Sequence, residues 1–306
     1  MVQRQDQQPV RYARSFVTGQ HAELHVLDVH TGVDELVFAS DERLFESPTW
    51  HPDGRHIVVN ADGLLFRVDS ERPSDLEEIP APGLPELNND HLVSPDGRYH
   101  YVSANDWHIY RLPWEGGDPE RVTSAKAPER AFRHFLHGIA PDGRTLAYVG
   151  TEYLDGDEWG RRALWLLELD SGEEQLLGDG YSPADGPDFA PDGRSVFFNS
   201  EMASDLPGHA QIFRHDLVDG SVEQLTFDDR VNWFPHCSPD GRRLAYLSYP
   251  RGTLGHPADL PVIVREIELP HGTARDLVAL AGGQGTINVP CWAPDSRRLA
   301  YISYPS

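Results

Sequence analysis

Residues 50–54 read Trp-His-Pro-Asp-Gly, and a closely related Pro-Asp turn recurs five more times along the chain. Proline presets φ for the second position of a tight turn, aspartate can bond back to the backbone, and glycine accepts a positive φ. The prolines of the six turns are Pro52, Pro95, Pro141, Pro191, Pro239 and Pro294. Successive turns are therefore 43, 46, 50, 48 and 55 residues apart, and the chain is built from one repeated unit.

Each repeat has the content of four short strands. A segment rich in β-branched and aromatic residues follows every turn, as at 56–60 and 145–150, and a further apolar segment comes next, as at 64–69 and 163–169. A short turn then leads to a last segment, such as 119–123 or 222–227. Units of about 45 residues with four strands are typical of propeller blades. We therefore predict an all-β fold, a six-bladed β-propeller with four antiparallel strands per blade.

The last repeat is incomplete, because only one strand, 298–303, follows its turn before the sequence ends at residue 306. Two unassigned strands lie at the other end of the chain, at 22–29 and 34–40. We predict that these N-terminal strands complete the last blade, since closing the ring leaves no open sheet edge. Residues 1–306 are thus expected to form a single domain, with an N-terminal arm over 1–20 and blade repeats from about 22 to 306. The sequence does not indicate where residues 12–18 lie relative to the blades.

These repeats resemble the TolB-type propeller family, a group of WD40-like Pro-Asp repeat proteins whose blades carry a Trp-Ser-Pro-Asp-Gly-x-x-Ile/Leu-Ala-Tyr core. The resemblance runs from about residue 22 to the end of the chain. It implies the six-bladed fold. It does not select one function, because propellers of this kind serve as binding scaffolds, as enzymes and as enzyme lids.

Composition excludes several kinds of partner. The chain has 26 Lys and Arg against 49 Asp and Glu, a net charge of −23, and no basic run. Nucleic acids and anionic membrane surfaces need a basic face, so we expect neither as a partner. No apolar run reaches the roughly 18 residues of a membrane-spanning helix. Residues 1–15 lack the apolar stretch of a secretory signal, which predicts a cytoplasmic protein. Cys237 and Cys291 are expected to be free thiols.

The longer connections between blades gather on one face. If the first strand of a repeat runs toward its Pro-Asp turn, the second runs back, so the loops that join blades lie on the face opposite the turns. These loops are 79–90, 124–134, 152–162, 201–210, 249–260 and 281–288. Loops on a rigid scaffold commonly carry binding residues. We expect this face to hold any functional site.

Histidines depart from the repeat at two places on this face. Proline occupies the fourth position before the Pro-Asp pair in four repeats, whereas His91 and His137 occupy it in the second and third. With His236 they place three imidazoles at similar heights, and imidazole suits Zn, Mn, Fe, Ni or Cu. The prediction is a divalent metal (Mn, Zn or Ca) on the axis. Separate hydrogen-bonded histidines, or a metal-free acid–base role, remain open.

Other polar residues lie at the same strand ends and are candidates for chemistry. Glu201 and Glu46 are the best acid–base candidates, since an apolar channel raises a carboxyl pKa towards neutrality, and Asp188 follows a rigid Gly-Pro pair. The candidates for substrate binding are Asn60, Asp90, Glu152, Asn199, Trp233 and Asn288. Tyr181 is a further candidate, as a stacking platform for a sugar ring.

A second, weaker resemblance is to propeller pectate lyases of the oligogalacturonate type, which hold a divalent metal near the axis with histidines and one glutamine. Gln284 stands ten residues before Pro294, about where that family has its glutamine. Ile287 and Val289 occupy the region of that family's flanking histidines. The resemblance therefore implies a metal set of Gln284 with the three histidines named above.

Three functions follow as hypotheses. The leading one is a metal-assisted carbohydrate-active enzyme, a lyase or glycoside hydrolase that acts on a small carbohydrate ligand at the channel mouth. The alternative is a non-catalytic TolB-like propeller that acts as a protein-binding scaffold. The third is a lactone hydrolase with calcium on the axis, bound by Glu46, Asp188, Asn199 and Glu201.

Overall fold

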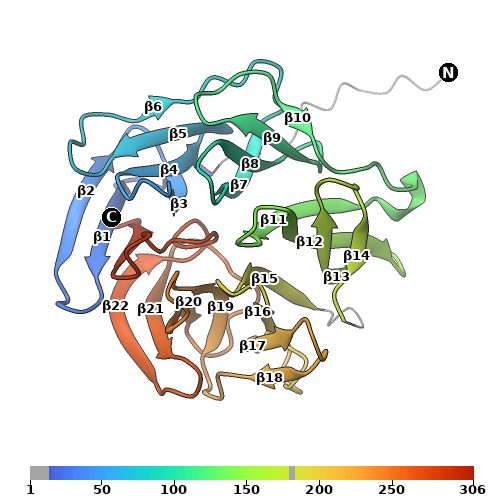
Figure 1. Ribbon diagram of the computed structural model, residues 1–306. Coiled ribbons are helices and arrows are strands. Elements are labelled where there is room, and N and C mark those ends of the chain that lie inside the picture. The colour runs from blue at the N-terminus through green and yellow to red at the C-terminus, as the bar shows by residue number, and fades with distance from the viewer. Residues whose placement is uncertain (1–13, 179–182) are drawn as a thin grey trace.

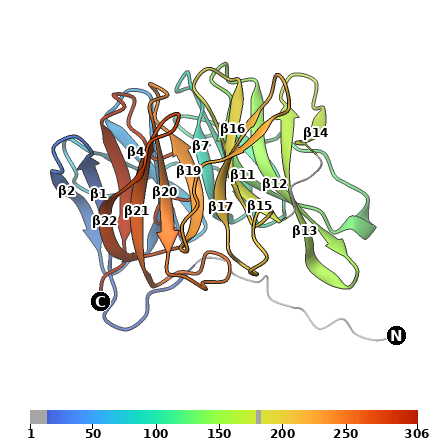
Figure 2. The same cartoon turned by 90° about the horizontal axis from the view of Figure 1, so that it is seen from below.

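The computed structural model describes residues 14–178 and 183–306. Six antiparallel sheets stand around a central axis like the blades of a propeller (Figure 1), and the strands run between two faces of the ring (Figure 2). Over the described ranges one helix is present, the 3-10 turn η1 (Pro128–Arg130). No helix in these ranges has the length and apolar character needed to cross a membrane. The predicted all-β, six-bladed fold is confirmed.

Five blades have four strands, and their sheets run outward from the axis in chain order. Blade 1 consists of β3 (Phe45–Trp50), β4 (His56–Ala61), β5 (Leu64–Asp69) and β6 (Glu77–Glu78). Blade 2 consists of β7 (Leu87–Val93), β8 (Tyr99–Ala104), β9 (Ile109–Pro113) and β10 (Glu120–Arg121). Blade 3 is β11 (Arg133–Ile139), β12 (Thr145–Leu154), β13 (Asp157–Glu168) and β14 (Glu174–Leu176). Blade 4 consists of β15 (Ala184–Phe189), β16 (Ser195–Ser200), β17 (Gln211–Asp216) and β18 (Val222–Gln224). Blade 5 consists of β19 (Val231–Cys237), β20 (Arg243–Tyr249), β21 (Leu260–Glu268) and β22 (Ala274–Gly282).

Blade 6 joins the two ends of the chain. Its sheet has the order β2 (Asp34–Ser40), β1 (Ala22–Asp28), β23 (Arg298–Ser303), and β1 pairs with β23 from Glu23–Ser303 to Asp28–Arg298. The predicted closure of the ring is confirmed. The innermost segment of this blade makes one bridge, between Trp292 and Leu299, and no strand is assigned to it. Residues 283–286 form a hydrogen-bonded turn there instead, in which the N–H of Thr286 donates to the carbonyl oxygen of Gly283 at 3.0 Å.

The six turns work as their sequences indicate. In each, the aspartate side chain accepts the N–H of the residue two positions later, at distances from 2.8 Å at Asp53 to 3.1 Å at Asp240. The glycines have φ between 69° and 73°, and Ser296 takes the same conformation at 57°. The turns are therefore local structures that each repeat forms with its own residues.

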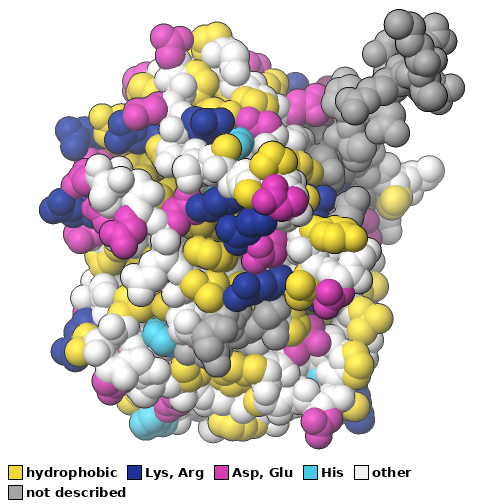
Figure 3. Space-filling view, turned by 90° about the vertical axis from the view of Figure 1, so that its right-hand side faces the viewer, with side chains coloured by type: hydrophobic (Ala, Val, Ile, Leu, Met, Phe, Trp, Pro, Cys, Tyr) yellow, Lys and Arg dark blue, Asp and Glu magenta, His cyan; other side chains and the backbone are white. Residues whose placement is uncertain are grey.

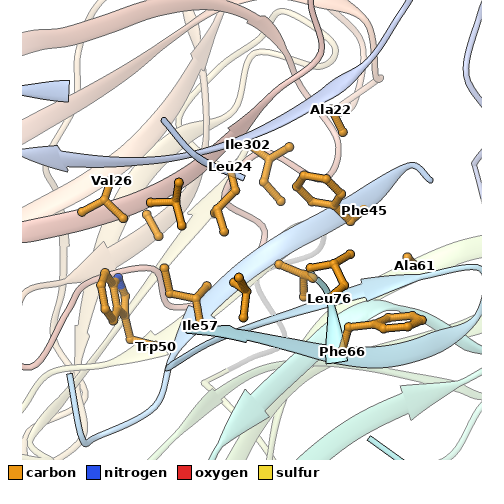
Figure 4. Close-up of a cluster of buried hydrophobic side chains, with 14 of the residues drawn as sticks. Ala22, Leu24, Val26, Phe45, Trp50, Ile57, Ala61, Phe66, Leu76 and Ile302 are labelled. Carbon is orange, nitrogen blue, oxygen red and sulfur yellow. The ribbon is translucent and has the colours of Figure 1, made fainter. Parts of the chain in front are cut away.

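The core lies between neighbouring blades. Figure 4 shows the cluster between blades 6 and 1, where Leu24 of β1 and Ile302 of β23 face Phe45 and Ile57 across the gap. Leu24, Phe45, Ile57 and Ile302 have no exposed surface. Since β1 comes from the N-terminus and β23 from the C-terminus, this cluster stabilises the closure of the ring.

The outer surface mixes charges of both signs. On the side of the ring seen in Figure 3, Lys and Arg lie interspersed with Asp and Glu. Many of these charges form ion pairs across strands, such as Arg67 with Glu77 at 2.8 Å and Arg265 with Asp276 at 2.7 Å. Exposed pairs of this kind stabilise a protein by less than about 1 kcal/mol each.

Leu24→Ala tests how much the closure depends on this cluster. We expect the free energy of unfolding to fall by about 2–5 kcal/mol, because the change opens a cavity between blade 6 and blade 1. The control is Val33→Ala in the β1–β2 turn, where the valine is 62% exposed and the expected change is within about 0.5 kcal/mol. Denaturant unfolding measures both, and equal losses for the two variants would contradict the assignment.

Candidate functional site

A cavity of about 340 Å³ opens at one mouth of the central channel, on the face opposite the Pro-Asp turns. Side chains of the inner and second strands line it, together with Arg162 of β13, three residues of the interblade loops and one of the N-terminal arm. These residues are Arg14, Glu46, Asn60, Leu87, Asn88, Asn89, Asp90, Phe135, His137, Val149, Thr151, Arg162, Asp185, Phe234, His256, Gln284 and Asn288.

A β-bulge in each inner strand directs these side chains. The pairing with the second strand shifts between Glu46 and Thr49 in β3, and equivalent shifts occur in β7, β11, β15 and β19. A bulge bends the strand and re-aims the side chains beside it. Ser47, Gly186 and Phe234 stand at the same place in their repeats, five residues before the turn proline, and all have φ between 55° and 60°. The bulge thus divides each inner strand into a part before it in the sequence, which contributes side chains to the cavity, and a part after it, which does not.

His137 is the centre of the cavity's charge network. Its Nε2 lies 3.2 Å from Asp185 Oδ1 and its Nδ1 lies 3.2 Å from the carbonyl oxygen of Asn288. Both neighbours only accept, so both ring nitrogens donate and the imidazole is a cation. Burial alone would lower the pKa of His137, but the negative charges of Asp90 and Asp185 outweigh it and raise the pKa to about 9. The same contact lowers the pKa of Asp185 despite its burial.

Asp90 is a buried carboxyl group beside this pair. Asp90 is the last residue of the run Asn88-Asn89-Asp90, and its backbone N–H donates to Asn88 Oδ1 at 2.9 Å. Burial raises the pKa of Asp90 to about 6, against the opposing effect of the His137 cation. The carboxyl group can therefore gain or lose a proton near neutral pH, which is a property of binding and catalytic sites.

Glu46 and Arg14 form the opposite wall. Arg14 donates to Glu46 Oε1 at 3.1 Å, to the carbonyl oxygen of Gln284 at 2.7 Å and to Asp259 Oδ1 at 2.8 Å, and its guanidinium lies 4.4 Å from the ring centre of Tyr304. Burial raises the pKa of Glu46 even though Arg14 lowers it. Arg14, at the described end of the N-terminal arm that the sequence could not place, thus lies at the rim of the cavity.

His256 completes the wall between Gln284 and blade 5. Its Nδ1 bonds to Gln284 Oε1, and its ring lies 4.6 Å from that of Trp233 and 5.0 Å from that of Phe234. Burial lowers the pKa of His256, so its imidazole is neutral. The loop 249–260 was expected on this face, but no pattern in it indicated that His256 would point inward.

Six of the predicted site residues line the cavity: Glu46, Asn60, Asp90, His137, Gln284 and Asn288. Asn60 is 4% exposed, and its Oδ1 has no hydrogen-bond partner. Asn288 Oδ1 accepts the N–H of Gly285 at 2.8 Å, which fixes the loop that carries Gln284. The sequence missed Arg14, Arg162 and His256, because Arg14 and His256 reach the cavity from an arm and a loop, and Arg162 from the third strand of blade 3, where no local pattern indicates it.

The three predicted metal-binding histidines do not meet. His91 Nε2 lies 3.4 Å from the carbonyl oxygen of Val58, and His236 donates Nε2–H to Ile287 at 2.8 Å, while His137 alone lines the cavity. In the described ranges none of the three belongs to a set of three His, Cys, Asp or Glu side chains close enough to hold one ion. The expected shared site is therefore corrected to three separate histidines, because the bulges turn His91 and His236 onto the backbones of neighbouring blades.

The remaining predicted residues lie outside the cavity. Asp188 accepts the N–H of Cys237 at 3.2 Å, and Glu201 accepts the N–H of Gly208 at 2.7 Å in its own loop. Glu152 pairs with Arg130 at 2.7 Å. Asn199 accepts the N–H of Phe234 at 3.1 Å and, with Glu201 and Trp233, lines a narrow neighbouring pocket.

These positions also correct the calcium hypothesis. Its four proposed ligands are divided, since Glu46 lines the cavity and Asp188, Asn199 and Glu201 do not. Tyr181 lies outside the described residues. The two cysteines are free, as expected.

His137→Gln tests the charge network. A histidine whose pKa is raised from about 6.5 to about 9 contributes stability that is complete below pH 6.5 and is lost as the pH rises through 9. We expect the parent to exceed the variant in free energy of unfolding by up to about 3 kcal/mol at pH 6, and by much less at pH 9.5. Denaturant unfolding across this range measures the difference. A difference independent of pH would mean that His137 is neutral.

The chain is similar to proteins of one family over nearly all of its length. Residues 93–257 match the family described as the TolB beta propeller domain. An uncharacterized protein of Agrobacterium fabrum strain C58 is 34% identical over 285 residues, which are 92% of each chain. A solved structure from Agrobacterium tumefaciens, provisionally described as TolB, is 33% identical, with a TM-score of 0.85 over 94% of this chain and 99% of the other. An oligogalacturonate lyase in complex with manganese is 14% identical, with a TM-score of 0.56 over 84% of this chain and 72% of the other, and shares the fold.

Proposed function

The chain belongs to the TolB β-propeller family, and from this membership we propose that it is a non-catalytic propeller that binds a segment of a partner protein in the cavity at its channel mouth. The cavity's volume, about 340 Å³, suits a few side chains of a loop or chain end rather than a folded domain. The partner would dock over the face and insert that segment.

The observation that carries this proposal is the internal bracing of the cavity. His137 is held by Asp185 and by the carbonyl of Asn288, Glu46 by Arg14, and His256 by Gln284. Groups fixed in this way keep the shape of the cavity before a ligand arrives, which lowers the entropic cost of binding. A general base needs a pKa near the working pH, and His137, with a pKa of about 9, is already protonated at pH 7.

The lining indicates the chemistry of the inserted segment. Asn60, Asn88, Asn89, Gln284 and Asn288 carry amide groups, which both donate and accept and so match the peptide groups of an extended chain.

The apolar parts of the wall and one carboxyl group add specificity. Leu87, Phe135, Val149 and Phe234 offer apolar surface to an aliphatic stem, and the buried carboxyl of Asp90 lies beside them. A lysine or arginine combines such a stem with a cationic head. We therefore infer that the segment inserts a basic side chain, whose charge would keep Asp90 ionised.

Asp90→Asn tests this function. Peptides selected from a random library on the full-length parent should bind at the cavity and carry a lysine or arginine. Their affinity for Asp90→Asn should fall about 10- to 100-fold, because a charge-assisted hydrogen bond is worth about 1.5–3 kcal/mol. Fluorescence anisotropy measures the binding.

The matched control is Asp229→Asn, which changes an exposed carboxylate whose side chain is 72% accessible, and it should leave the affinity unchanged. Phe234→Leu retains an apolar wall and should weaken binding less than Asp90→Asn does. Selected peptides that bind the parent and Asp90→Asn equally would rule out the cavity as their site.

A second candidate is the metal-assisted carbohydrate-active enzyme, a lyase or hydrolase. One observation favours it: Asp90, with a pKa of about 6, lies in a polar cavity close enough to His137 for each to shift the other's pKa, as acid–base pairs do in enzymes. The fold shared with the manganese-bound lyase does not bear on activity. Incubation with neutral and acidic oligosaccharides, with and without Mn²⁺, Zn²⁺ or Ca²⁺, distinguishes the two. Turnover that Asp90→Asn abolishes would establish the enzyme and refute the scaffold.

A further inference from the structure

The first Pro-Asp turn differs from the other five by two histidines. His51 precedes its proline and His56 is the second residue after its glycine. The corresponding pairs in the other turns are Ser94 and Tyr99, Ala140 and Thr145, Ala190 and Ser195, Ser238 and Arg243, and Ala293 and Arg298. The turn needs neither histidine for its own hydrogen bonds, since the other five form without them. This turn lies on the face opposite the cavity.

The turn itself orients the carboxylate between the two imidazoles. Asp53 Oδ1 accepts the N–H groups of Arg55, at 2.8 Å, and His56, at 3.0 Å. Its other oxygen, Oδ2, lies 3.0 Å from His51 Nδ1 and 2.7 Å from His56 Nδ1. Among the residues that the structure describes, His51, Asp53 and His56 are the one set of three His, Cys, Asp or Glu side chains whose possible metal-binding atoms lie within 4.8 Å of one another.

The neighbours of His51 fix which of its nitrogens is free to bind. Nε2 lies 3.0 Å from the carbonyl oxygen of Gly97 in the next blade, so Nε2 carries the hydrogen. Nδ1 then has a lone pair, which accepts a 3.1 Å bond from the N–H of Asp53 and points at Asp53 Oδ2. Two acceptors at 3.0 Å repel each other unless a positive charge lies between them. A histidine that binds a metal commonly donates its other N–H to a carbonyl in this way.

The surroundings hold His51 in place and leave the set accessible. The ring of Trp114 lies 4.0 Å from that of His51 and 5.9 Å from that of His56. A Cβ at residue 97 would stand 2.6 Å from His51 Nε2, so only glycine permits this approach. The side chains of Asp53 and His56 are 36% and 29% exposed, which gives an ion a path from solvent.

We propose that His51 Nδ1, Asp53 Oδ2 and His56 Nδ1 together bind one zinc-like divalent ion. Two imidazoles and a carboxylate suit Zn²⁺ rather than Ca²⁺ or Mg²⁺, which prefer oxygen ligands. Zinc bonds of about 2.0 Å in a tetrahedron place the ligand atoms about 3.3 Å apart. Asp53 Oδ2, at 3.0 and 2.7 Å from the two nitrogens, would move away from them by about 0.3 and 0.6 Å, and the three ligand atoms already lie within 4.8 Å of one another. The ion would take over the lone pair of His51 Nδ1 from the Asp53 N–H, and water would fill the fourth position.

This site is independent of the proposed function, since none of its residues lines the cavity. Its effect would be structural. Because His51 also bonds to Gly97, the ion would stabilise both the β3–β4 hairpin and its contact with blade 2. An ion that binds only the folded state raises the free energy of unfolding with its concentration.

The test is zinc binding by the full-length, tag-free protein, measured by competition with a chromophoric chelator. We expect one equivalent of Zn²⁺ to bind the parent and to raise its unfolding midpoint. The double variant His51→Ala/His56→Ala should bind at least tenfold more weakly and show no rise. Its circular dichroism without metal should match the parent, because the other turns fold without histidines.

Two controls locate the ion. His271→Ala, which removes a histidine whose side chain is 75% exposed, should bind zinc like the parent. Gly97→Ala keeps all three ligands but displaces His51, so it should weaken zinc binding, whereas Gly143→Ala, at the same place in another turn, should not. A parent that binds no zinc, or a double variant that binds as tightly as the parent, overturns the proposal. Binding lost in His137→Gln but kept in the double variant would also overturn it, since the ion would then lie in the cavity.

Discussion

The pairing of β1 with β23 is the constraint on which the rest of the structure depends. The cavity is assembled from all six blades, so its walls keep their positions only if the ring is closed. Closure also explains the arm: once β1 is fixed beside β23, the residues before it emerge at the channel mouth, where Arg14 reaches Glu46 and Gln284. One strand pair therefore closes the sheet edges and places a cation at the rim.

The sequence was sufficient for the architecture because each blade is specified locally. A Pro-Asp-Gly turn forms from its own residues, and its period gives the number of blades. The terminal strands could be assigned because blade 6 lacked them. The innermost segment of that blade is the exception, since residues 283–286 form a turn and one bridge, between Trp292 and Leu299, stands where a strand was expected.

The site was predictable only in part, because strand ends give the height of a residue but not the direction of its side chain. Glu46, Asn60 and Asp90 were identified by height and do line the cavity. His91 and His236 were identified in the same way, yet the bulges turn them onto the backbones of neighbouring blades. Arg14 and His256 come from an arm and a loop, where contacts over 32 and 28 residues of sequence leave no local pattern.

Hydrogen–deuterium exchange of the parent, with and without a cavity-selected peptide, tests the central claim most directly. If a partner segment inserts at the channel mouth, exchange should slow at residues 87–90, which line the cavity, and in the segment that carries Gln284 and Asn288, and stay unchanged at the six Pro-Asp turns. Slowing at the turns or along the outer strands, with the cavity residues unaffected, would contradict it.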